Sequence, residues 1–318
     1  MTRILTADIG GTNSRFGSFR VDESGSLTLE AVEWLPTEAD GSMSAQLKKL
    51  YDSDFPLTPE ETGMAVFAVA GPVKDGRYSK LPLAGWEIDL DLVCKDFPLT
   101  RAALINDFHA QALAVKTTPG KNARPILPGA PIPNAPVAVV GAGTGLGKAL
   151  LVMDQNQKAM VIASEGGHAD FPFIGGPEGE YLKFLQGKTG NRYLSGNSVV
   201  SGQGLSYLHE FISGEQLEPA QVVQQFATYP QTLEWAARFY GRVCRNYLLE
   251  TLALGGLYLA GGVAAKAPAL VEHPQFKEEL RNSATMGELL QGVPVWLIFD
   301  ENSGLWGAAN FALGYLNP

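Results

Sequence analysis

The chain has 318 residues, of which 45% are hydrophobic and 18% charged, and its formal net charge at pH 7 is −9. This length allows two domains with buried cores, and the composition is that of a soluble globular protein. The acidic balance provides no broad basic field for phosphate backbones, so we expect no nucleic acid partner. No uninterrupted apolar run approaches the roughly 18 residues that cross a bilayer, so we expect no membrane partner.

The two cysteines, Cys94 and Cys244, are too few and too far apart for a disulfide scaffold or a four-cysteine zinc site. This usage fits a reducing compartment best. Only four uncharged residues separate Arg3 from Asp8, which is too short for the apolar part of a signal peptide. We therefore expect a cytoplasmic protein.

The first third of the chain has the pattern of an α/β unit, in which short apolar runs alternate with helical periodicity. The predicted elements are strands at 3–7, 16–21 and 27–34, a helix at 43–50, a strand at 64–70, a helix at 90–97 and a strand at 102–105. Asp89 is placed to cap the second of these helices.

The first predicted turn, between residues 8 and 15, has a glycine tip at Gly10 and Gly11. Backbone N–H groups in such a tip can form an anion-binding nest, to which the Thr12 hydroxyl and the Asn13 amide add donors. Asp8 beside the nest suits a Mg²⁺ ion that bridges phosphates, since Mg²⁺ takes only one or two carboxylates. The alternative is an ordinary hairpin turn.

A polar pair, Asn106 and Asp107, follows the strand at 102–105, and helical spacing resumes at Ala110 and Leu113. A carboxylate at the end of a strand and ahead of a helix points into the crevice where open α/β sheets bind ligands. The alternative is that Asp107 only caps the helix that follows.

A proline-rich segment at 119–136 is predicted to be a loop near the start of a second domain, and a second glycine-rich turn follows at 141–147. Its spacing rejects a dinucleotide fingerprint, because Leu146 and Lys148 stand where a glycine is needed. It also rejects a P-loop, which needs Gly at 142 and Ser or Thr at 149, where this chain has alanines. Strand-like runs on both sides make the turn another hairpin tip. We expect the two tips to face each other across a cleft and to hold the phosphates of a nucleotide.

Glu165 and His168 lie three residues apart, across Gly166 and Gly167, after a predicted strand at 159–163. A carboxylate and an imidazole at this spacing can both hydrogen-bond one small polar ligand. The alternatives are a surface turn for Glu165 and a structural role for His168.

The chain is predicted to be mainly helical after residue 177. The predicted elements are helices at 178–185, 204–212, 219–227 and 232–253, a strand at 254–260, a helix opened by Gly261 and Gly262, a strand at 293–299 and a terminal helix at 303–315. The aromatic residues of the long helix have core spacing, so we expect them in the core and not in a site.

Five segments together resemble one known family and occur in its order. They are DIGGTNSR at 8–15, LINDFHAQA at 104–112, GAGTGLG at 141–147, SEGGHADF at 164–171 and YLAGGV at 258–263. The two hairpin tips and the late glycine turn resemble those of the sugar kinase, actin and chaperone ATPase superfamily. Within it the five segments are similar to the bacterial glucokinase family, with a match that extends from residue 4 to about residue 309.

The resemblance implies an α/β, two-domain actin-like ATPase (ribonuclease H-like) fold, with mixed sheets flanked by helices and a cleft between the domains. The expected domains are a small one at 1–107 plus 303–318 and a large one at 108–302. The implied activity is ATP-dependent phosphorylation of glucose to glucose 6-phosphate, the first step of glycolysis. ATP and Mg²⁺ are the implied cofactors, and a homodimer is the implied assembly.

The resemblance also implies roles for individual residues. Asp107 would be the catalytic base on the attacking hydroxyl, Asp8 would lie near Mg²⁺, and Gly261 and Gly262 would lie against the adenosine. The residues that would bind the sugar are Asn106, Asp107, Glu165, His168 and Asn197. The residues that would bind the nucleotide are Ala7, Asp8, Ile9, Gly10, Gly11, Thr12, Asn13, Gly141, Gly143, Thr144, Gly145, Gly261 and Gly262.

Two departures from the family leave the identity of the sugar open. Asn197 stands where the family has a glutamate, and Pro82 and Leu83 replace its Thr-Asn ahead of Trp86. Charged acceptors bind hydroxyls about twice as strongly as neutral ones, so a second hypothesis is a kinase for another hexose or an N-acyl hexosamine. A third is a non-catalytic sugar-sensing regulator, which would need a helix-turn-helix that we do not expect ahead of a strand at Arg3.

Overall fold

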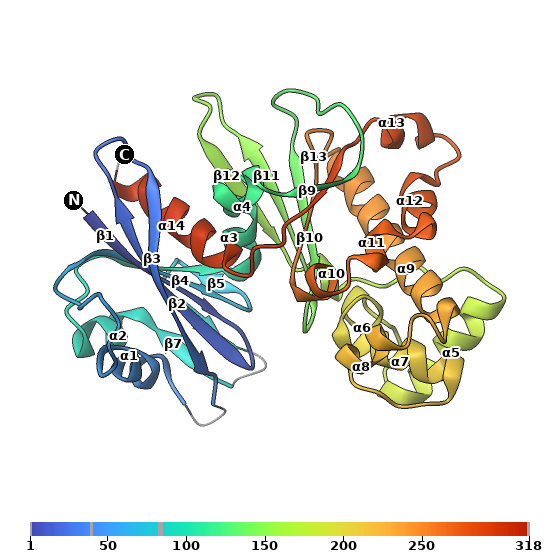
Figure 1. Ribbon diagram of the computed structural model, residues 1–318, viewed down its shortest axis with the longest axis horizontal. Helices are drawn as coiled ribbons and strands as arrows, with labels where there is room; N and C mark the ends of the chain where they lie inside the picture. The colour runs from blue at the N-terminus through green and yellow to red at the C-terminus, as the bar shows by residue number, and fades with distance from the viewer. Residues whose placement is uncertain (1, 39–40, 82–84, 317–318) are drawn as a thin grey trace. The chain divides into compact units, whose positions relative to one another are not determined.

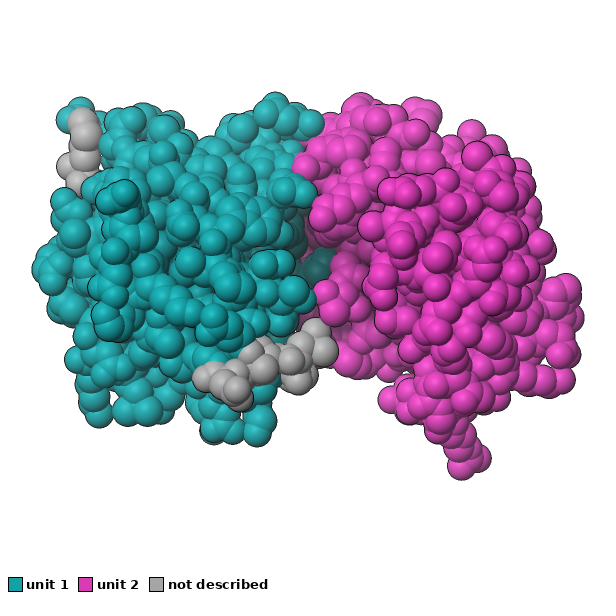
Figure 2. Space-filling view, turned by 60° about the horizontal axis from the view of Figure 1, so that its bottom comes forward, with its two compact units in different colours: residues 1–122, 300–318 teal, residues 123–299 magenta. Residues whose placement is uncertain are grey.

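The computed structural model describes residues 2–38, 41–81 and 85–316, and the prediction that rests on Pro82 and Leu83 lies outside them. Two compact units divide the chain, residues 1–122 with 300–318 and residues 123–299 (Figure 2). Each unit contains a mixed β-sheet against which helices pack (Figure 1).

The main sheet of the first unit has the strand order β3-β2-β1-β4-β8. Its strands are β1 (Thr2–Ile9), β2 (Asn13–Val21), β3 (Leu27–Pro36), β4 (Thr62–Val69) and β8 (Ala102–Asn106). β1, β2 and β3 pair antiparallel, whereas β1, β4 and β8 run parallel to one another. The strands predicted in this part of the chain are confirmed, with small shifts at their ends.

Alternating side chains of this sheet pack on opposite faces, as the strand period requires. The helices of the unit are α1 (Met43–Tyr51), α2 (Leu90–Asp96), α3 (Asp107–Ala114), α4 (Thr118–Lys121) and α14 (Ser303–Leu316). Leu5 and Phe67 share a core with α1 and α2. Ile4 and Val66 share a second core with α3 and α14. Asp89 caps α2 as predicted, since its side chain accepts from two backbone N–H groups of the first turn.

α3 belongs to the first unit because it packs closely on α14. A Cβ added at Gly307 would lie 1.7 Å from the Ala110 carbonyl oxygen, so only glycine permits this approach. The Ser303 hydroxyl also donates to Gln111 Oε1 at 2.8 Å. The units therefore divide after residue 122 and before residue 300, and not after 107 and before 303 as the sequence suggested.

The sheet of the second unit has the order β12-β11-β10-β13-β14-β9. Its strands are β9 (Arg124–Leu127), β10 (Val137–Ala142), β11 (Leu146–Met153), β12 (Ala159–Ser164), β13 (Gly256–Ala260) and β14 (Val295–Leu297). β10, β11 and β12 pair antiparallel, and β10, β13 and β14 run parallel. The first five positions repeat the plan of the first sheet.

Helices from the C-terminal half cover this second sheet. They are α5 (Pro177–Thr189), α6 (Gly196–Val199), α7 (Gly202–Ser213), α8 (Pro219–Gln224), α9 (Pro230–Thr251), α10 (Gly262–Lys266), α11 (Ala269–Glu272), α12 (Pro274–Arg281) and α13 (Gly287–Gln291). Tyr240 and Tyr247 of α9 are buried in the core, as predicted. Within the described ranges, no helix combines the length and the apolar character needed to cross a membrane.

A buried arginine connects three of these helices. Arg242 of α9 is 1% exposed, and its guanidinium donates to Glu178 of α5 at 2.6 and 2.9 Å. It also donates to Glu279 of α12 at 2.9 Å and to the Pro172 carbonyl at 3.0 Å. Glu279 has a second partner, Arg245, at 2.8 Å. Removal of the Arg242 guanidinium would therefore leave Glu178 buried without its cation.

Several short elements were not predicted from the sequence. The segment at 119–136, predicted to be a loop, contains the end of α4 and the strand β9. A small sheet of β5 (Val73–Lys74), β6 (Tyr78–Lys80) and β7 (Glu87–Asp89) also forms in the first unit. These pieces are too short to show a period, and each is defined by its pairing with a neighbour.

Candidate active site

The first hairpin tip connects β1 and β2 within the first unit. The Gly10 N–H donates to the Asn13 carbonyl at 3.1 Å, and the Thr37 N–H donates to the Thr12 carbonyl at 2.9 Å. Thr12 and Asn13 are both exposed, so their side chains are accessible to a ligand. The tip is thus a fixed backbone loop with exposed donors, as an anion nest requires.

Asp8 lies on β1 immediately ahead of this tip, opposite Arg15 on β2. Burial raises the pKa of the Asp8 carboxyl, and the positive charge of Arg15 opposes that rise. The first turn of α14 closes over the carboxylate, because a Cβ added at Gly304 would lie 2.7 Å from Asp8 Oδ2. A desolvated carboxylate of this kind gains from a nearby cation.

The Asp8 carboxylate fits Mg²⁺ better than a metal ion that takes all its ligands from protein side chains. Among the described residues no group of three or more His, Cys, Asp or Glu side chains could hold a metal ion. Mg²⁺ takes one or two carboxylates together with phosphate oxygens and waters, so a single carboxylate such as Asp8 is compatible with this ion.

Asn106 and Asp107 stand at the junction of β8 and α3. Asn106 is the N-cap of α3, because its Oδ1 accepts from the N–H groups of Phe108 at 2.9 Å and His109 at 3.2 Å. Its Nδ2 donates to the Gly71 carbonyl at 3.1 Å. The alternative that Asp107 is the cap is therefore wrong, because position 107 already belongs to the helix.

The Asp107 side chain is held by the same turn. Its Oδ1 accepts from the N–H of Phe108 at 2.9 Å, and the residue is half-buried. Among the residues that the structure describes, the Asn106 amide uses one of its two N–H hydrogens in the bond to Gly71. The local structure thus fixes the carboxylate at the carboxyl end of a parallel strand, where open sheets bind ligands.

The second hairpin tip connects β10 and β11 in the second unit and is held by neighbouring helices. The Gly143 N–H donates to the Gly145 carbonyl at 2.8 Å, and the Gly202 N–H of α7 donates to the Gly143 carbonyl at 2.9 Å. The Leu146 N–H donates to Asn197 Oδ1 at 2.6 Å. Thr144 at the tip is exposed. The prediction of a hairpin here, and not a P-loop, is confirmed.

Glu165, His168 and Asn197 lie together in the second unit. Glu165 precedes a single helical turn, η1 (Gly166–His168), and its Oε2 lies 3.7 Å from His168 Nε2. Asn197 Nδ2 lies 3.2 Å from the ring nitrogens of His168. The side chains of His168 and Glu165 are 69% and 56% exposed, which leaves both open to a ligand. The structure thus brings together three residues predicted to bind the sugar.

The late glycine turn lies beside the end of β10. Gly261 has φ +84°, and a Cβ there would lie 2.6 Å from the Ala142 carbonyl oxygen, so two requirements select glycine. A Cβ on Gly262 would meet nothing within 4 Å, which leaves open space over this backbone. Gly141 pairs with Ala260 across β10 and β13, so the turn and the second hairpin are neighbours.

Three contacts near these loops were missed by the sequence analysis. Arg15 faces Asp8, and the Ala142 N–H donates to the buried Tyr240 hydroxyl at 3.3 Å. Lys148 is buried beside the turn at 165–168, with its Nζ 5.3 Å from the Tyr247 ring centre, and burial lowers the pKa of its ammonium. The position of Lys148 directly after the glycine turn was the available signal, but we tested it only as a P-loop lysine.

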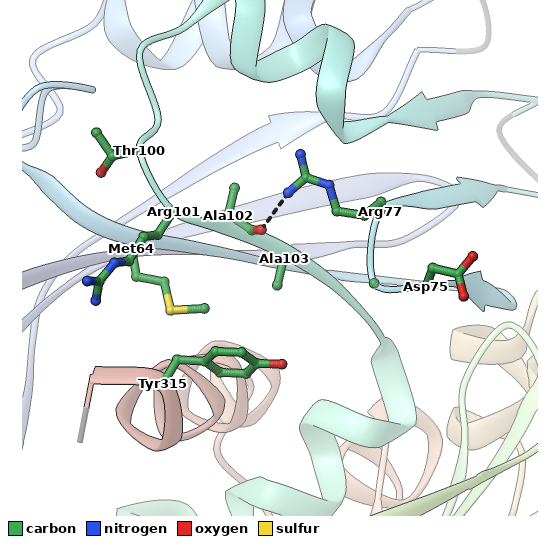
Figure 3. Close-up of a pocket in the computed structure, with 9 residues that line it drawn as sticks. Met64, Asp75, Arg77, Thr100, Arg101, Ala102, Ala103 and Tyr315 are labelled. Atoms are coloured by element: carbon green, nitrogen blue, oxygen red, sulfur yellow. Dashed lines mark hydrogen bonds between the residues drawn. The ribbon is translucent and has the colours of Figure 1, made fainter. Parts of the chain in front are cut away.

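A separate pocket of about 490 Å³ lies in the first unit (Figure 3). It is lined by Met64, Asp75, Gly76, Arg77, Thr100, Arg101, Ala102, Ala103 and Tyr315. Arg77 donates to the Ala102 carbonyl at 3.1 Å and is paired with Asp91. None of the site residues predicted from the sequence belongs to this lining, so the pocket is not the candidate active site.

The sequence profile of the glucokinase family matches residues 5–314. A glucokinase from Nostoc sp. is 31% identical over 341 aligned positions, which cover 97% of this chain and 98% of the relative.

Two solved structures extend the comparison. The crystal structure of a glucokinase from an Antarctic psychrotroph has a TM-score of 0.80 at 27% identity and covers 99% of both chains. A ROK family glucokinase from Streptomyces griseus, in complex with glucose and AMPPNP, has a TM-score of 0.62 at 18% identity, covers 97% of this chain and 98% of its own, and supports the fold alone. The predicted actin-like ATPase fold is confirmed, and the chain belongs to the glucokinase family.

Proposed function

We propose that this member of the glucokinase family transfers the terminal phosphoryl group of ATP to the 6-hydroxyl of glucose, with Asp107 as the catalytic base. Phosphoryl transfer needs positioning and charge neutralisation more than covalent chemistry. The observation that carries the proposal is the fixed placement of Asp107 at the junction of β8 and α3, beside the Asn106 cap.

Asp107 accepts the proton of the attacking sugar hydroxyl, and a base of this kind contributes about 10² to 10⁴ in rate. Glu165 accepts from neighbouring hydroxyls, and His168 donates to or accepts from them. The exposure of both side chains supports this role. Asn106 adds its remaining N–H hydrogen.

The two hairpin tips hold the phosphates of the nucleotide. In the first unit the Gly10–Gly11 backbone and the exposed Thr12 and Asn13 supply donors, and in the second unit Thr144 does so with its flanking glycines. The open backbone at Gly262 receives the adenosine. Bound at Asp8, Mg²⁺ would supply charge neutralisation to the phosphates.

We extend the proposal to the setting of the reaction. The enzyme acts in the cytoplasm as a homodimer and provides glucose 6-phosphate for glycolysis. Its cysteines, Cys94 and Cys244, are both free, which supports a reducing compartment.

A specific observation favours a second candidate, a kinase for another hexose or an N-acyl hexosamine. Both polar atoms of the Asn197 amide are engaged, one with Leu146 and one with His168, whereas a glutamate at this position in the family contacts the sugar. The charged contact to the sugar is therefore replaced, which changes the hydroxyl pattern that the site recognises.

A coupled ADP-release assay over a panel of hexoses and N-acyl hexosamines tests both candidates. We expect ATP-dependent turnover with the highest kcat/KM for glucose. A higher kcat/KM for another sugar would establish the second candidate. Release of ADP with none of the sugars, by a protein that still binds them, would contradict the kinase and favour a sugar sensor.

A further inference from the structure

Asn197 occupies an unusual position between two loops of the second unit. It lies on α6, and its Oδ1 accepts from the Leu146 N–H at the base of the second hairpin at 2.6 Å. Its Nδ2 lies 3.2 Å from the ring nitrogens of His168, which follows β12 on the turn η1. One side chain thus joins a loop proposed to hold phosphates to a turn proposed to hold the sugar.

Glycines bring the three segments into close contact around this amide. A Cβ at Gly167 would lie 1.8 Å from the Leu146 carbonyl oxygen and 2.8 Å from Asn197 Oδ1. A Cβ at Gly196 would lie 2.7 Å from Leu146 Cδ2 and 3.1 Å from the Gly167 carbonyl oxygen. The hairpin, the turn and α6 therefore pack backbone to backbone, and a displacement of one is transmitted to the others.

The hydrogen-bond inventory sets the role of each atom. Oδ1 is an acceptor and receives the Leu146 N–H, so Nδ2 is the donor toward His168. The ring nitrogen that receives it carries no proton. Glu165 Oε2 lies 3.7 Å from His168 Nε2, so we assign Nδ1 as the acceptor and Nε2 as the protonated nitrogen.

We propose that Asn197 is a positioning residue that couples the phosphate hairpin to His168, so that nucleotide and sugar bind with linked affinities. This inference rests on the proposed function, because it assigns the ligands of the two loops from it. Linkage is reciprocal: nucleotide that orders the hairpin raises the affinity for sugar, and sugar raises the affinity for nucleotide by the same factor.

A carboxylate at this position would not reproduce the arrangement. It has no N–H to donate to an unprotonated imidazole nitrogen. It would keep an acceptor for Leu146 but would require His168 to donate. The asparagine therefore selects the arrangement in which one ring nitrogen of His168 accepts from Asn197 and Nε2–H lies toward Glu165.

Two variants separate the two halves of the link. Asn197→Asp keeps an acceptor for the Leu146 N–H and loses the donor to His168, whereas Asn197→Ala loses both. Asn191→Ala is the matched control, since Asn191 is an exposed amide of the same unit with no side-chain hydrogen bond among the described residues.

Titration calorimetry gives the Kd of AMPPNP alone, of glucose alone and of glucose with AMPPNP bound. Amide NMR of Leu146 and the ¹⁵N shifts of the His168 ring report the two bonds without any ligand.

We expect Asn197→Ala to weaken AMPPNP by about two- to tenfold, which is the worth of one hydrogen bond, and to abolish the change in glucose Kd on AMPPNP binding. Asn197→Asp should keep the Kd of AMPPNP and the Leu146 amide signal, weaken glucose and change the ¹⁵N shifts of the His168 ring, because the donor to that ring is lost. Asn191→Ala should behave as the unsubstituted protein.

The link is overturned if Asn197→Ala weakens glucose while the Kd of AMPPNP and the Leu146 amide are unchanged, because Asn197 would then contact only sugar. It is also overturned if the two substitutions give the same Leu146 and His168 spectra. A failure of the proposed function has a different signature. The unsubstituted protein would then turn over no sugar, while the ligand-free spectra of the variants still decide whether Asn197 joins the two loops.

Discussion

The two units use one sheet plan, yet they carry different chemistry at its ends. Each has three antiparallel strands followed by two parallel ones, with a glycine hairpin between the first two. In the first unit Asp8 precedes the hairpin and Asp107 follows the last parallel strand of the sheet. In the second unit the last strand residues ahead of the hairpin are Gly141 and Ala142, which have no charge.

The hairpins also differ in what holds them. The first is fixed by the residue that follows β3, since the Thr37 N–H donates to the Thr12 carbonyl. The second is fixed by residues far along the chain, through Gly202 and Asn197. The comparison teaches that a repeated scaffold can carry a carboxylate near the end of the first strand in one unit and an uncharged residue at the matching position in the other.

The largest expected effect is on kcat and comes from Asp107 of the first unit. Asp107→Asn should lower kcat by about 10² to 10⁴, because the amide cannot accept the proton of the sugar hydroxyl. AMPPNP should bind as before, since no nucleotide contact is assigned to Asp107. Steady-state kinetics and calorimetry measure the two quantities. Turnover close to that of the unsubstituted protein would remove Asp107 from its role as base.

The next effect belongs to the second unit alone and concerns stability. Arg242→Ala should lower the free energy of unfolding by about 3–5 kcal/mol, because Glu178 then stays buried without its cation. Arg238→Ala on the same helix is the control: its pair with Glu234 is partly exposed and should contribute about 0.3–0.5 kcal/mol. Urea unfolding measures both. Equal losses of unfolding free energy in the two variants would contradict the expectation that the buried Arg242 pair contributes more than the exposed Arg238 pair.

A third prediction concerns Asp8, where we expect activity and stability to change in opposite directions. Asp8→Asn should weaken the binding of Mg²⁺ by at least about tenfold. Loss of a group that only supports a metal ligand costs about that much, and the role proposed for Asp8 is that of a ligand itself. The substitution should raise stability, since burial raises the pKa of the carboxyl and disfavours its charged form.

The sign of the pH dependence follows from that raised pKa. The folded protein holds the Asp8 proton more tightly than the unfolded chain, so this group costs stability as the pH rises from its unfolded pKa through its folded pKa. The stability gained by Asp8→Asn should therefore grow over that window. Urea unfolding at a series of pH values measures it, and a gain that shrinks as the pH rises would contradict the assignment.

The smallest expected effect tests the cap beside the acid. Asn106→Ala should lower stability by about 0.5–2 kcal/mol, because two N–H groups of α3 lose their acceptor. Asn106→Ser keeps a capping oxygen and should recover most of that loss. Thermal unfolding compares the two variants. If serine were no better than alanine, capping would not be the function of the Asn106 side chain.

The hairpins and the carboxylate were predictable because their signals are local. Two adjacent glycines, Gly10 and Gly11, mark the first tight turn, and Gly143 and Gly145 mark the second. The polar pair at 106–107 follows an apolar run and so marks the end of a strand. The choice between Asn106 and Asp107 as cap was not predictable. Both residue types cap helices, and the backbone of Asn106, at φ −67° and ψ 148°, decides the matter.

Contacts between distant segments were also beyond the sequence. Asn197 was assigned from its place in a motif, but its bond to the Leu146 N–H spans 51 positions and depends on the packing of α6. β9 has a proline at position 125 and gains its strand character only by pairing with β14. The pairing of Arg242 with Glu178 needs two helices to be docked first.

The last helix has a consequence for how the chain is made. α14 supplies Leu305, Ala308 and Ala312 to the core beneath β1 and β4, and Gly304 closes on Asp8. During synthesis the first 122 residues therefore leave the ribosome without the helix that covers one face of their sheet. The second unit is complete before that helix emerges, so the half of the molecule begun first is the half finished last.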